Sequence, residues 1–181
     1  MKALLDTCVI YPTVMREILL AVAGTGAFQP LWSDRILEEW ARAARKFGPD
    51  GEPQARAEIA LLQAQWPRAN VSYPPSLEAR LYLPDENDRH VLAAAIAGSA
   101  DVIVTMNAQD FPRHTLSEEG LARQAPDEFL YGFWLNAPDA VAAAVEQVRQ
   151  QADRLSGETW DVRRLLKKAR LPRLGKALSA A

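Results

Sequence analysis

Two acidic residues follow apolar segments that are typical of buried strands. Asp6 comes directly after the short run Lys2–Leu5, and Asp110 lies five residues beyond the segment Asp101–Thr105. In open α/β sheets, ligands bind at the carboxyl ends of the strands. We therefore expect both carboxylates to lie at one edge of a parallel sheet.

Further acids lie at or near predicted helix starts. Asp85 and Asp88 precede an alanine-rich helical pattern, and a helix that crosses back over a parallel sheet begins at the same edge. Glu39 lies about two turns into the helix predicted after Ser33, at the border of its apolar face. Each acid alone has an ordinary explanation, because helix capping favours Asp85 and Asp88 and a lone Glu39 is typical of a solvated helix. Taken together, four separate segments direct carboxylates to one edge.

Carboxylates gathered in this way raise one another's pKa unless a cation neutralises them. Oxygen ligands without Cys or His select Mg²⁺ or Mn²⁺ over Zn²⁺. The chain has one cysteine, Cys8, and two histidines, His90 and His114; we interpret Cys8 as a small buried apolar residue and both histidines as ordinary polar residues. The chemistry indicated is metal-dependent phosphodiester hydrolysis by water.

Competing chemistries have weaker support in the sequence. It contains no G-x-S-x-G elbow, no dinucleotide fingerprint and no P-loop. A phosphotransferase of the haloacid-dehalogenase kind also begins with a strand that ends in Asp. Its second acid would stand two positions after Asp6, where this chain has Cys8.

Alternating helical and extended patterns position these acids. Pro84 to Thr105 combines a helix, Gly98 at the C′ position and a strand, which is half of a parallel α/β unit. Phe47 is placed on the apolar face of the helix after Ser33. The other predicted elements are helices at 12–24, 53–66, 126–135, 138–155 and 159–169, and extended segments at 28–32 and 69–73.

Charge is distributed unevenly along the 181 residues, whose formal net charge is −2. Residues 1–155 have a net charge of −7, and residues 156–181 have a net charge of +5. This division excludes a uniformly basic nucleic-acid coat. The single cysteine excludes an internal disulfide, and Asp6 interrupts any signal-peptide core. The longest apolar run, Val91–Ala97, is too short to span a membrane, so a soluble cytoplasmic protein is expected.

Four ordered blocks of the sequence resemble those of PIN domains, most closely the VapC-type toxins of bacterial toxin–antitoxin systems. The blocks are Leu4–Pro12, Ser33–Trp40, Leu83–Ala95 and Val102–Pro112. The resemblance implies an α/β/α sandwich around a mostly parallel sheet. It also implies a Mg²⁺- or Mn²⁺-dependent endoribonuclease that cuts RNA, is inhibited by a cognate antitoxin and forms dimers.

The resemblance assigns roles to particular residues. The acids map onto Asp6, Glu39, Asp88 and Asp110, with Asp6 and Asp88 as the firmest metal ligands. Supporting positions around these carboxylates are Thr7, Asp85, Thr105 and Asn107. Many PIN domains have an acid where this chain has Asn107, and relatives often have one at Asn87. These departures favour the alternative of a catalytically weak module that binds RNA or a protein.

The C-terminal part resembles a helical segment that some longer toxins carry. We predict a nuclease domain at 1–136 and a helical extension with a basic tail at 137–181. Arg163, Lys167 and Arg170 share a helical face. Three roles stay open for this face, namely a solvated cap on the core, a contact to RNA phosphates, or docking on an acidic surface of a second copy or an antitoxin.

Overall fold

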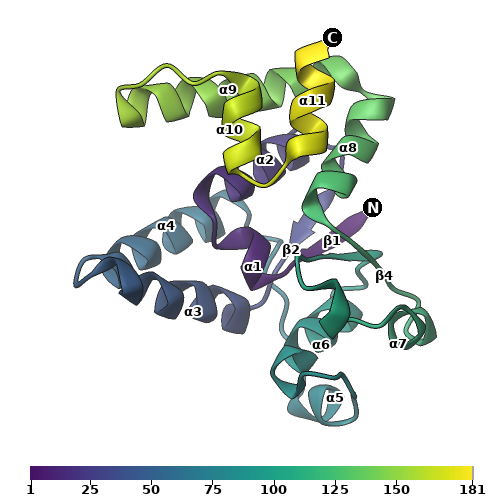
Figure 1. Cartoon of the computed structure of the whole chain (residues 1–181). Coiled ribbons are helices and arrows are strands. Elements are labelled where there is room, and N and C mark those ends of the chain that lie inside the picture. Colours follow the sequence, from purple (N-terminus) through teal and green to yellow (C-terminus); the bar gives the residue numbers. More distant parts are fainter. Residues whose placement is uncertain (181) are drawn as a thin grey trace.

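The computed structural model describes residues 1–180 and shows an α/β fold around a parallel sheet (Figure 1). Within this range the strands are β1 Lys2–Leu5, β2 Gln29–Leu31, β3 Val102–Val104 and β4 Ala122–Gln124. Their order across the sheet is β2-β1-β3-β4, and every neighbouring pair is parallel. The predicted fold class is therefore confirmed.

Helices connect the strands in the described range. The longer ones are α2 Thr13–Gly24, α3 Asp34–Ala43, α4 Gly51–Gln65, α6 Arg89–Ala97, α8 Pro126–Asn136, α9 Pro138–Ser156 and α11 Pro172–Ala180. The shorter ones are α1 Thr7–Ile10, α5 Pro75–Ala79, α7 Arg113–Glu118 and α10 Val162–Lys168, with 3₁₀ turns η1 Ala44–Phe47, η2 Glu86–Asp88 and η3 Ala108–Asp110.

The strand order determines where ligands can approach the sheet. The chain moves from β1 outward to β2, then returns past β1 to β3 and continues to β4. Because parallel crossovers are right-handed, this reversal puts α2 and α6 on opposite faces of the sheet (Figure 1). The reversal leaves a switch point between the carboxyl ends of β1 and β3, where open α/β sheets bind ligands.

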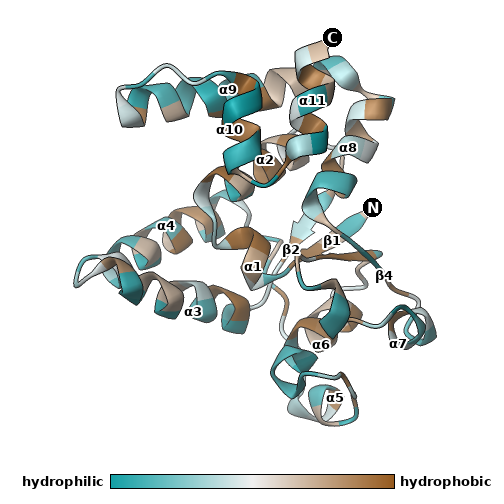
Figure 2. Ribbon diagram, viewed as in Figure 1, coloured by the Kyte–Doolittle hydropathy of each residue, from teal (hydrophilic) through white to brown (hydrophobic). Residues whose placement is uncertain are grey.

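Local sequence signals explain most element boundaries. The Ser33 side chain caps α3 by accepting a hydrogen bond from the Ile36 backbone N–H at 3.3 Å, as predicted. Ala3, Leu4 and Leu5 of β1 are buried in the sheet, and Figure 2 shows hydrophobic colour on α1, which follows β1 in the chain. The predicted helix at 53–66 is α4, which ends before Pro67.

Two predictions about elements are wrong, and one strand is not predicted. Phe47 is 70% exposed, because the chain after Ala43 winds as the tighter turn η1 and rotates this ring off the apolar face of α3. The segment 69–73 is not a strand in the described structure and pairs only as a bridge between Asn70 and Trp32. The pattern of residues does not indicate β4, because it is a three-residue edge strand with a polar sequence.

The prediction of Gly98 at the C′ position is wrong as well. Gly98 is the C-cap of α6 with a right-handed φ of −77°, and Ser99 follows with a positive φ of 51°. The small size of Gly98 matters for a different reason. A Cβ atom there would lie 2.9 Å from Cδ1 of Leu31 and 3.0 Å from Cγ2 of Val71, so Gly98 allows α6 to approach β2.

The C-terminal helices pack against the rest of the fold. Helix α9 lies on α2 and α8, and α11 lies on α8 and α10 (Figure 1). Buried residues from Ala3 in β1 to Leu174 in α11 belong to one continuous hydrophobic core. The predicted domain boundary coincides with the junction of α8 and α9 at Ala137, and the division into two domains stays a prediction.

A candidate carboxylate metal site

Asp6 is held at the switch point by the two central strands. It follows β1, precedes α1 and is only 4% exposed. Its Oδ2 accepts hydrogen bonds from Oγ1 of Thr105 at 2.7 Å and from Sγ of Cys8 at 3.1 Å. Both donors act on one carboxylate oxygen, and within residues 1–180 no hydrogen bond engages Oδ1. Asp6 can therefore present Oδ1 to a ligand while Oδ2 fixes its orientation.

Thr105 and Cys8 connect Asp6 to the end of β3. Oγ1 of Thr105 also accepts a hydrogen bond from the Asn107 backbone N–H at 3.0 Å, and Sγ of Cys8 accepts one from the Met106 N–H at 3.2 Å. Burial, followed by the nearby charge of Asp6, raises the pKa of the Cys8 thiol to about 12. Cys8 thus remains a protonated donor, which corrects its interpretation as a purely apolar residue.

Glu39 is bound by donors from two other segments. Oγ1 of Thr7 donates to its Oε2 at 2.6 Å, and Nε2 of His90 lies 2.8 Å from its Oε1. Burial raises the pKa of Glu39, but hydrogen bonds from His90 and Thr7 outweigh it, and the pKa is lowered overall. Glu39 is accordingly held as a carboxylate.

His90 is a residue of this site that the sequence analysis interpreted as an ordinary polar side chain. It is 1% exposed, and among the described residues its Nδ1 has no hydrogen-bond partner. The signal in the sequence was its position two residues after Asp88, on the same helix start. His114 lies elsewhere, exposed on α7.

Asp88 faces the other carboxylates. Its side chain makes no capping hydrogen bond to α6 in the described structure. Burial, followed by the charges of Asp6, Asp85 and Asp110, raises the pKa of Asp88 to about 6. Carboxylates from three separate segments are therefore close enough to influence Asp88.

Asp85 and Asn87 have a local structural role. Oδ1 of Asp85 accepts hydrogen bonds from the backbone N–H of Asn87 at 2.9 Å and from its side-chain Nδ2 at 3.0 Å. Asp85 thereby caps the 3₁₀ turn η2, which is the simpler of its two expected roles. Asn107 is exposed and precedes η3, and Asp110 is half-buried at the end of that turn.

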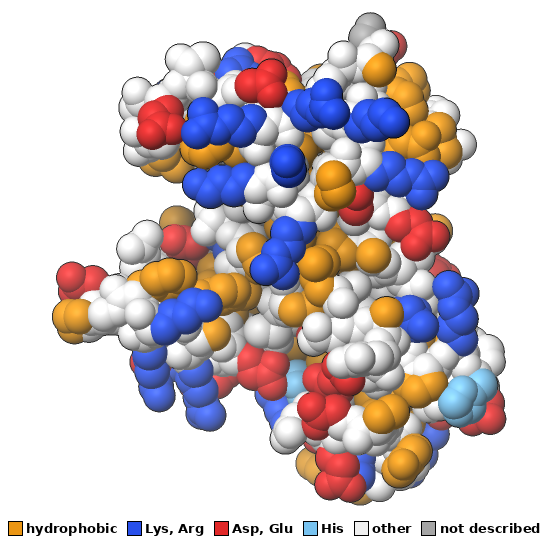
Figure 3. All heavy atoms as spheres, in the orientation of Figure 1, with side chains coloured by type: hydrophobic (Ala, Val, Ile, Leu, Met, Phe, Trp, Pro, Cys, Tyr) orange, Lys and Arg blue, Asp and Glu red, His pale blue; other side chains and the backbone are white. Residues whose placement is uncertain are grey.

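The chemistry of this donor set fits a hard divalent cation. All four candidate ligands are carboxylates, and the repulsion of Asp88 by Asp6 and Asp110 favours a positive charge between these three. Among residues 1–180, however, no three Asp, Glu, His or Cys side chains are grouped tightly enough to hold a metal ion as they stand. Asp and Glu side chains gather between α3 and α6 on the face shown in Figure 3.

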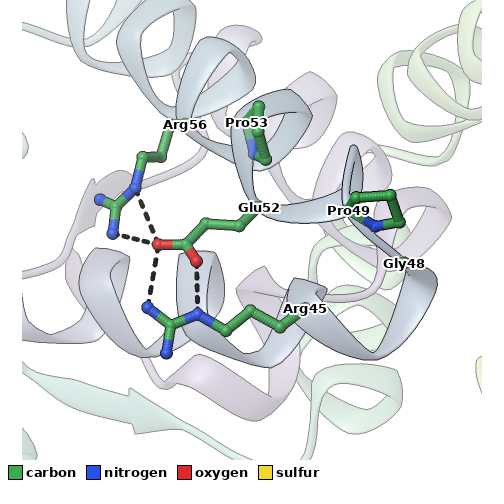
Figure 4. A pocket seen from close by; sticks show the side chains of 6 residues that line it. All are labelled: Arg45, Gly48, Pro49, Glu52, Pro53 and Arg56. Carbon is green, nitrogen blue, oxygen red and sulfur yellow. Dashed lines mark hydrogen bonds and ion pairs between the residues drawn. The ribbon is translucent and has the colours of Figure 1, made fainter.

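A second cluster of charges is neutralised internally. The cavity in Figure 4 is lined by Arg45, Glu52 and Arg56 together with Gly48, Pro49 and Pro53. Glu52 accepts hydrogen bonds from both arginines, and Arg56 also pairs with Glu38. These charges therefore stabilise the junction of α3 and α4 rather than provide free ligands.

Comparisons with known proteins give one family match. Residues 2–109 match the family model described as PIN domain. No curated protein matches the chain. A solved structure, that of VapBC-1 from nontypeable Haemophilus influenzae at 2.2 Å resolution, is 22% identical, with a TM-score of 0.46. That alignment covers 70% of this chain and 98% of the other.

In the described part of the chain, no helix has the length and apolar character needed to cross a membrane.

Proposed function

The chain belongs to the PIN domain family, and on that premise we propose that it is a Mg²⁺- or Mn²⁺-dependent endoribonuclease. The observation that carries this proposal is the placement of Asp88, whose side chain makes no capping hydrogen bond in the described structure and lies near Asp6 and Asp110 from two other segments. Burial and the charges of Asp6, Asp85 and Asp110 raise the pKa of Asp88, which supports the same interpretation.

In this proposal, Asp6 and Asp88 hold the metal ion, and Glu39 and Asp110 complete the pocket directly or through water. A bound divalent cation supplies Lewis-acid stabilisation of the phosphate and lowers the pKa of the attacking water. The surrounding residues prepare the ligands for this task. Thr105 and Cys8 fix Oδ2 of Asp6, while Thr7 and His90 keep Glu39 ionised and oriented.

We also propose the biological role of a toxin that a cognate antitoxin inhibits. Support comes from the four ordered sequence blocks that resemble VapC-type toxins, which include Asp6, Glu39, Asp88 and Asp110. A second copy of the chain is a further proposed partner. Coexpression with the protein encoded by an adjacent small reading frame tests the role, and cell growth that is unaffected by the chain alone would contradict it.

Replacing Asp6 or Asp88 by Asn tests the nuclease activity. Each substitution keeps the side-chain size but removes a charged ligand, so we expect cleavage of single-stranded RNA to fall by about 100-fold or more. Asp139→Asn is a matched control, because Asp139 is exposed on α9. EDTA should stop cleavage, and Mn²⁺ or Mg²⁺ should restore it. Full activity of a pure Asp6→Asn protein would rule out this site.

The second candidate function is a weak PIN-like module that binds RNA or a protein without cutting. The observation in its favour is the absence of a ready-made metal cluster in residues 1–180, together with Asn107 at a position where many PIN domains have an acid. Titration calorimetry with Mn²⁺ separates the two functions. The nuclease should bind Mn²⁺ and lose this binding in Asp88→Asn, whereas the module should show no such site.

A further inference from the structure

The C-terminal helices present a surface of positive charges that the protein does not neutralise. All seven Lys and Arg side chains of this surface are exposed, and none forms an ion pair within residues 1–180. We call them the basic helical surface: Arg163, Arg164, Lys167, Lys168, Arg170, Arg173 and Lys176. In the body, by contrast, arginines such as Arg56 and Arg149 are paired with acids.

Aromatic rings lie among these cations. The guanidinium of Arg164 and the ammonium of Lys168 lie 5.0 Å and 4.8 Å from the centre of the Trp160 ring, and Arg173 lies 4.0 Å from the centre of the Tyr131 ring. A cation–π contact orders a side chain without cancelling its charge. Both rings are half-buried, so the surface combines available positive charge with aromatic side chains.

Arg170 occupies a backbone position that normally suits glycine. It follows α10 with a φ of 61°, and the Leu171 N–H reaches back to the Leu166 carbonyl at 2.8 Å. A left-handed conformation is strained for a residue with a Cβ atom. The chain therefore carries a large, exposed cation at a position where glycine would be less strained.

The basic helical surface and the carboxylate site share one face of the molecule. In Figure 3, Lys and Arg side chains gather over α10 and α11, and Asp and Glu side chains gather lower on the same face, between α3 and α6. Hydrophobic side chains lie between the two groups. A single strand lying along this face can contact both ends of it.

We propose that the basic helical surface binds the sugar–phosphate backbone of the RNA strand that the carboxylate site cuts; this inference rests on the proposed function. Residues 1–155 have a net charge of −7, which disfavours the binding of phosphates to the body as a whole. A strand therefore needs a separate anchor. The occupant is inferred to be RNA because RNA is the substrate of the proposed function. The cations held over Trp160 and Tyr131 keep their charge for contacts with its phosphates.

A triple variant, Arg163→Ala with Lys167→Ala and Arg170→Gly, tests this surface in the full-length protein. Binding of a labelled single-stranded RNA is measured by fluorescence anisotropy in EDTA at several salt concentrations. Each lost phosphate contact reduces the slope of log K against log salt by about 0.7, so the triple variant should lose about 2 from the slope and bind about tenfold more weakly. Arg68→Ala is the control, since Arg68 is exposed and without an ion pair in residues 1–180.

Arg170→Gly alone separates binding from a structural role. Glycine relieves the left-handed strain, so the melting temperature should stay the same or rise while RNA affinity falls. Unchanged affinity and salt slope in the triple variant would overturn the inference. The inference would also be overturned if poly-glutamate competed as effectively as RNA of equal charge, because this result would identify an acidic protein as the occupant. If RNA binds through this surface but is never cut, the result contradicts the proposed nuclease activity and leaves the proposed binding surface intact.

Discussion

Asp88 and Asp6 play different parts in the carboxylate site. Asp6 is bound by two donors from β3 and α1. Asp88 makes no capping bond in the described structure and faces three other acids. A carboxylate in this position binds a proton more tightly in the folded chain than in the unfolded chain, where its pKa is 3.8.

This difference predicts how stability changes with pH in chelator-treated protein. The folded-state pKa of about 6 lies above the unfolded value of 3.8, so the folded chain binds more protons between these values. The free energy of unfolding should therefore decrease, on account of Asp88, as pH rises from about 4 to about 6, and level off above. In Asp88→Asn this decrease should disappear. Urea unfolding at pH 4, 5, 6 and 7 measures it, and equal slopes in both proteins would contradict the prediction.

The sequence predicted the acids and, through the family resemblance, the supporting residues Thr7 and Thr105, but not the donors Cys8 and His90. The spacing of Asp6, Asp88 and Asp110 relative to strands and helix starts was enough to direct them to one edge, and their catalytic role stays a prediction. The roles of Cys8 and His90 depend on the directions in which their side chains leave the first turns of α1 and α6. A pattern of residue types does not encode these directions, so both residues were interpreted as ordinary.

At the scale of elements, close packing explains the glycine at the junction of α6 and β3 better than turn chemistry does. The helix–glycine–strand unit at 84–105 is confirmed as η2, α6 and β3. Gly98 within it is needed for the approach of α6 to β2 rather than for a left-handed turn. The sequence could predict a glycine-dependent junction but not which atoms meet there, because Leu31 and Val71 come from distant segments.

Gly98→Ala should destabilise the protein by about 1–2 kcal/mol, since the new methyl group meets Leu31, Val71 and the carbonyl oxygen of Ala94. Gly24→Ala provides the contrast. No atom lies within 4 Å of a Cβ built at Gly24 at the end of α2, so this change should be neutral or slightly stabilising. Chemical denaturation of both variants measures the difference, and equal stabilities would show that the contact at Gly98 is unimportant.

At the scale of the whole molecule, the core does not stop at the predicted domain boundary. Leu174 of α11 is fully buried and belongs to the same hydrophobic core as β1. The sequence indicated a separate extension at 137–181, because this part resembles a helical segment that some longer toxins carry. It could not show that α9 would pack on α2, because that contact joins segments more than one hundred residues apart in the chain.

A continuous core predicts that the chain unfolds as one unit. Leu174→Ala should lower the free energy of unfolding by about 2–4 kcal/mol and shift a single thermal transition of the entire protein. Leu155→Ala is the control, because Leu155 is 79% exposed and its loss should cost little. Calorimetry distinguishes the outcomes. Two transitions, with only one affected by Leu174→Ala, would instead support the two-domain division.

The central position of β1 has a consequence for the order in which the protein is made. Strand β1 is synthesised before both of its neighbours in the sheet. Its partner β2 follows soon afterwards in the chain, but its other partner, β3, follows about one hundred residues later. The donor from Thr105 to Asp6 spans 99 positions, and Asp88 and Asp110 also come late. A nascent chain that has not yet reached Asp110 has no assembled pocket. The proposed nuclease is thus inactive until synthesis has passed Asp110, and an inhibitor is needed only after that point.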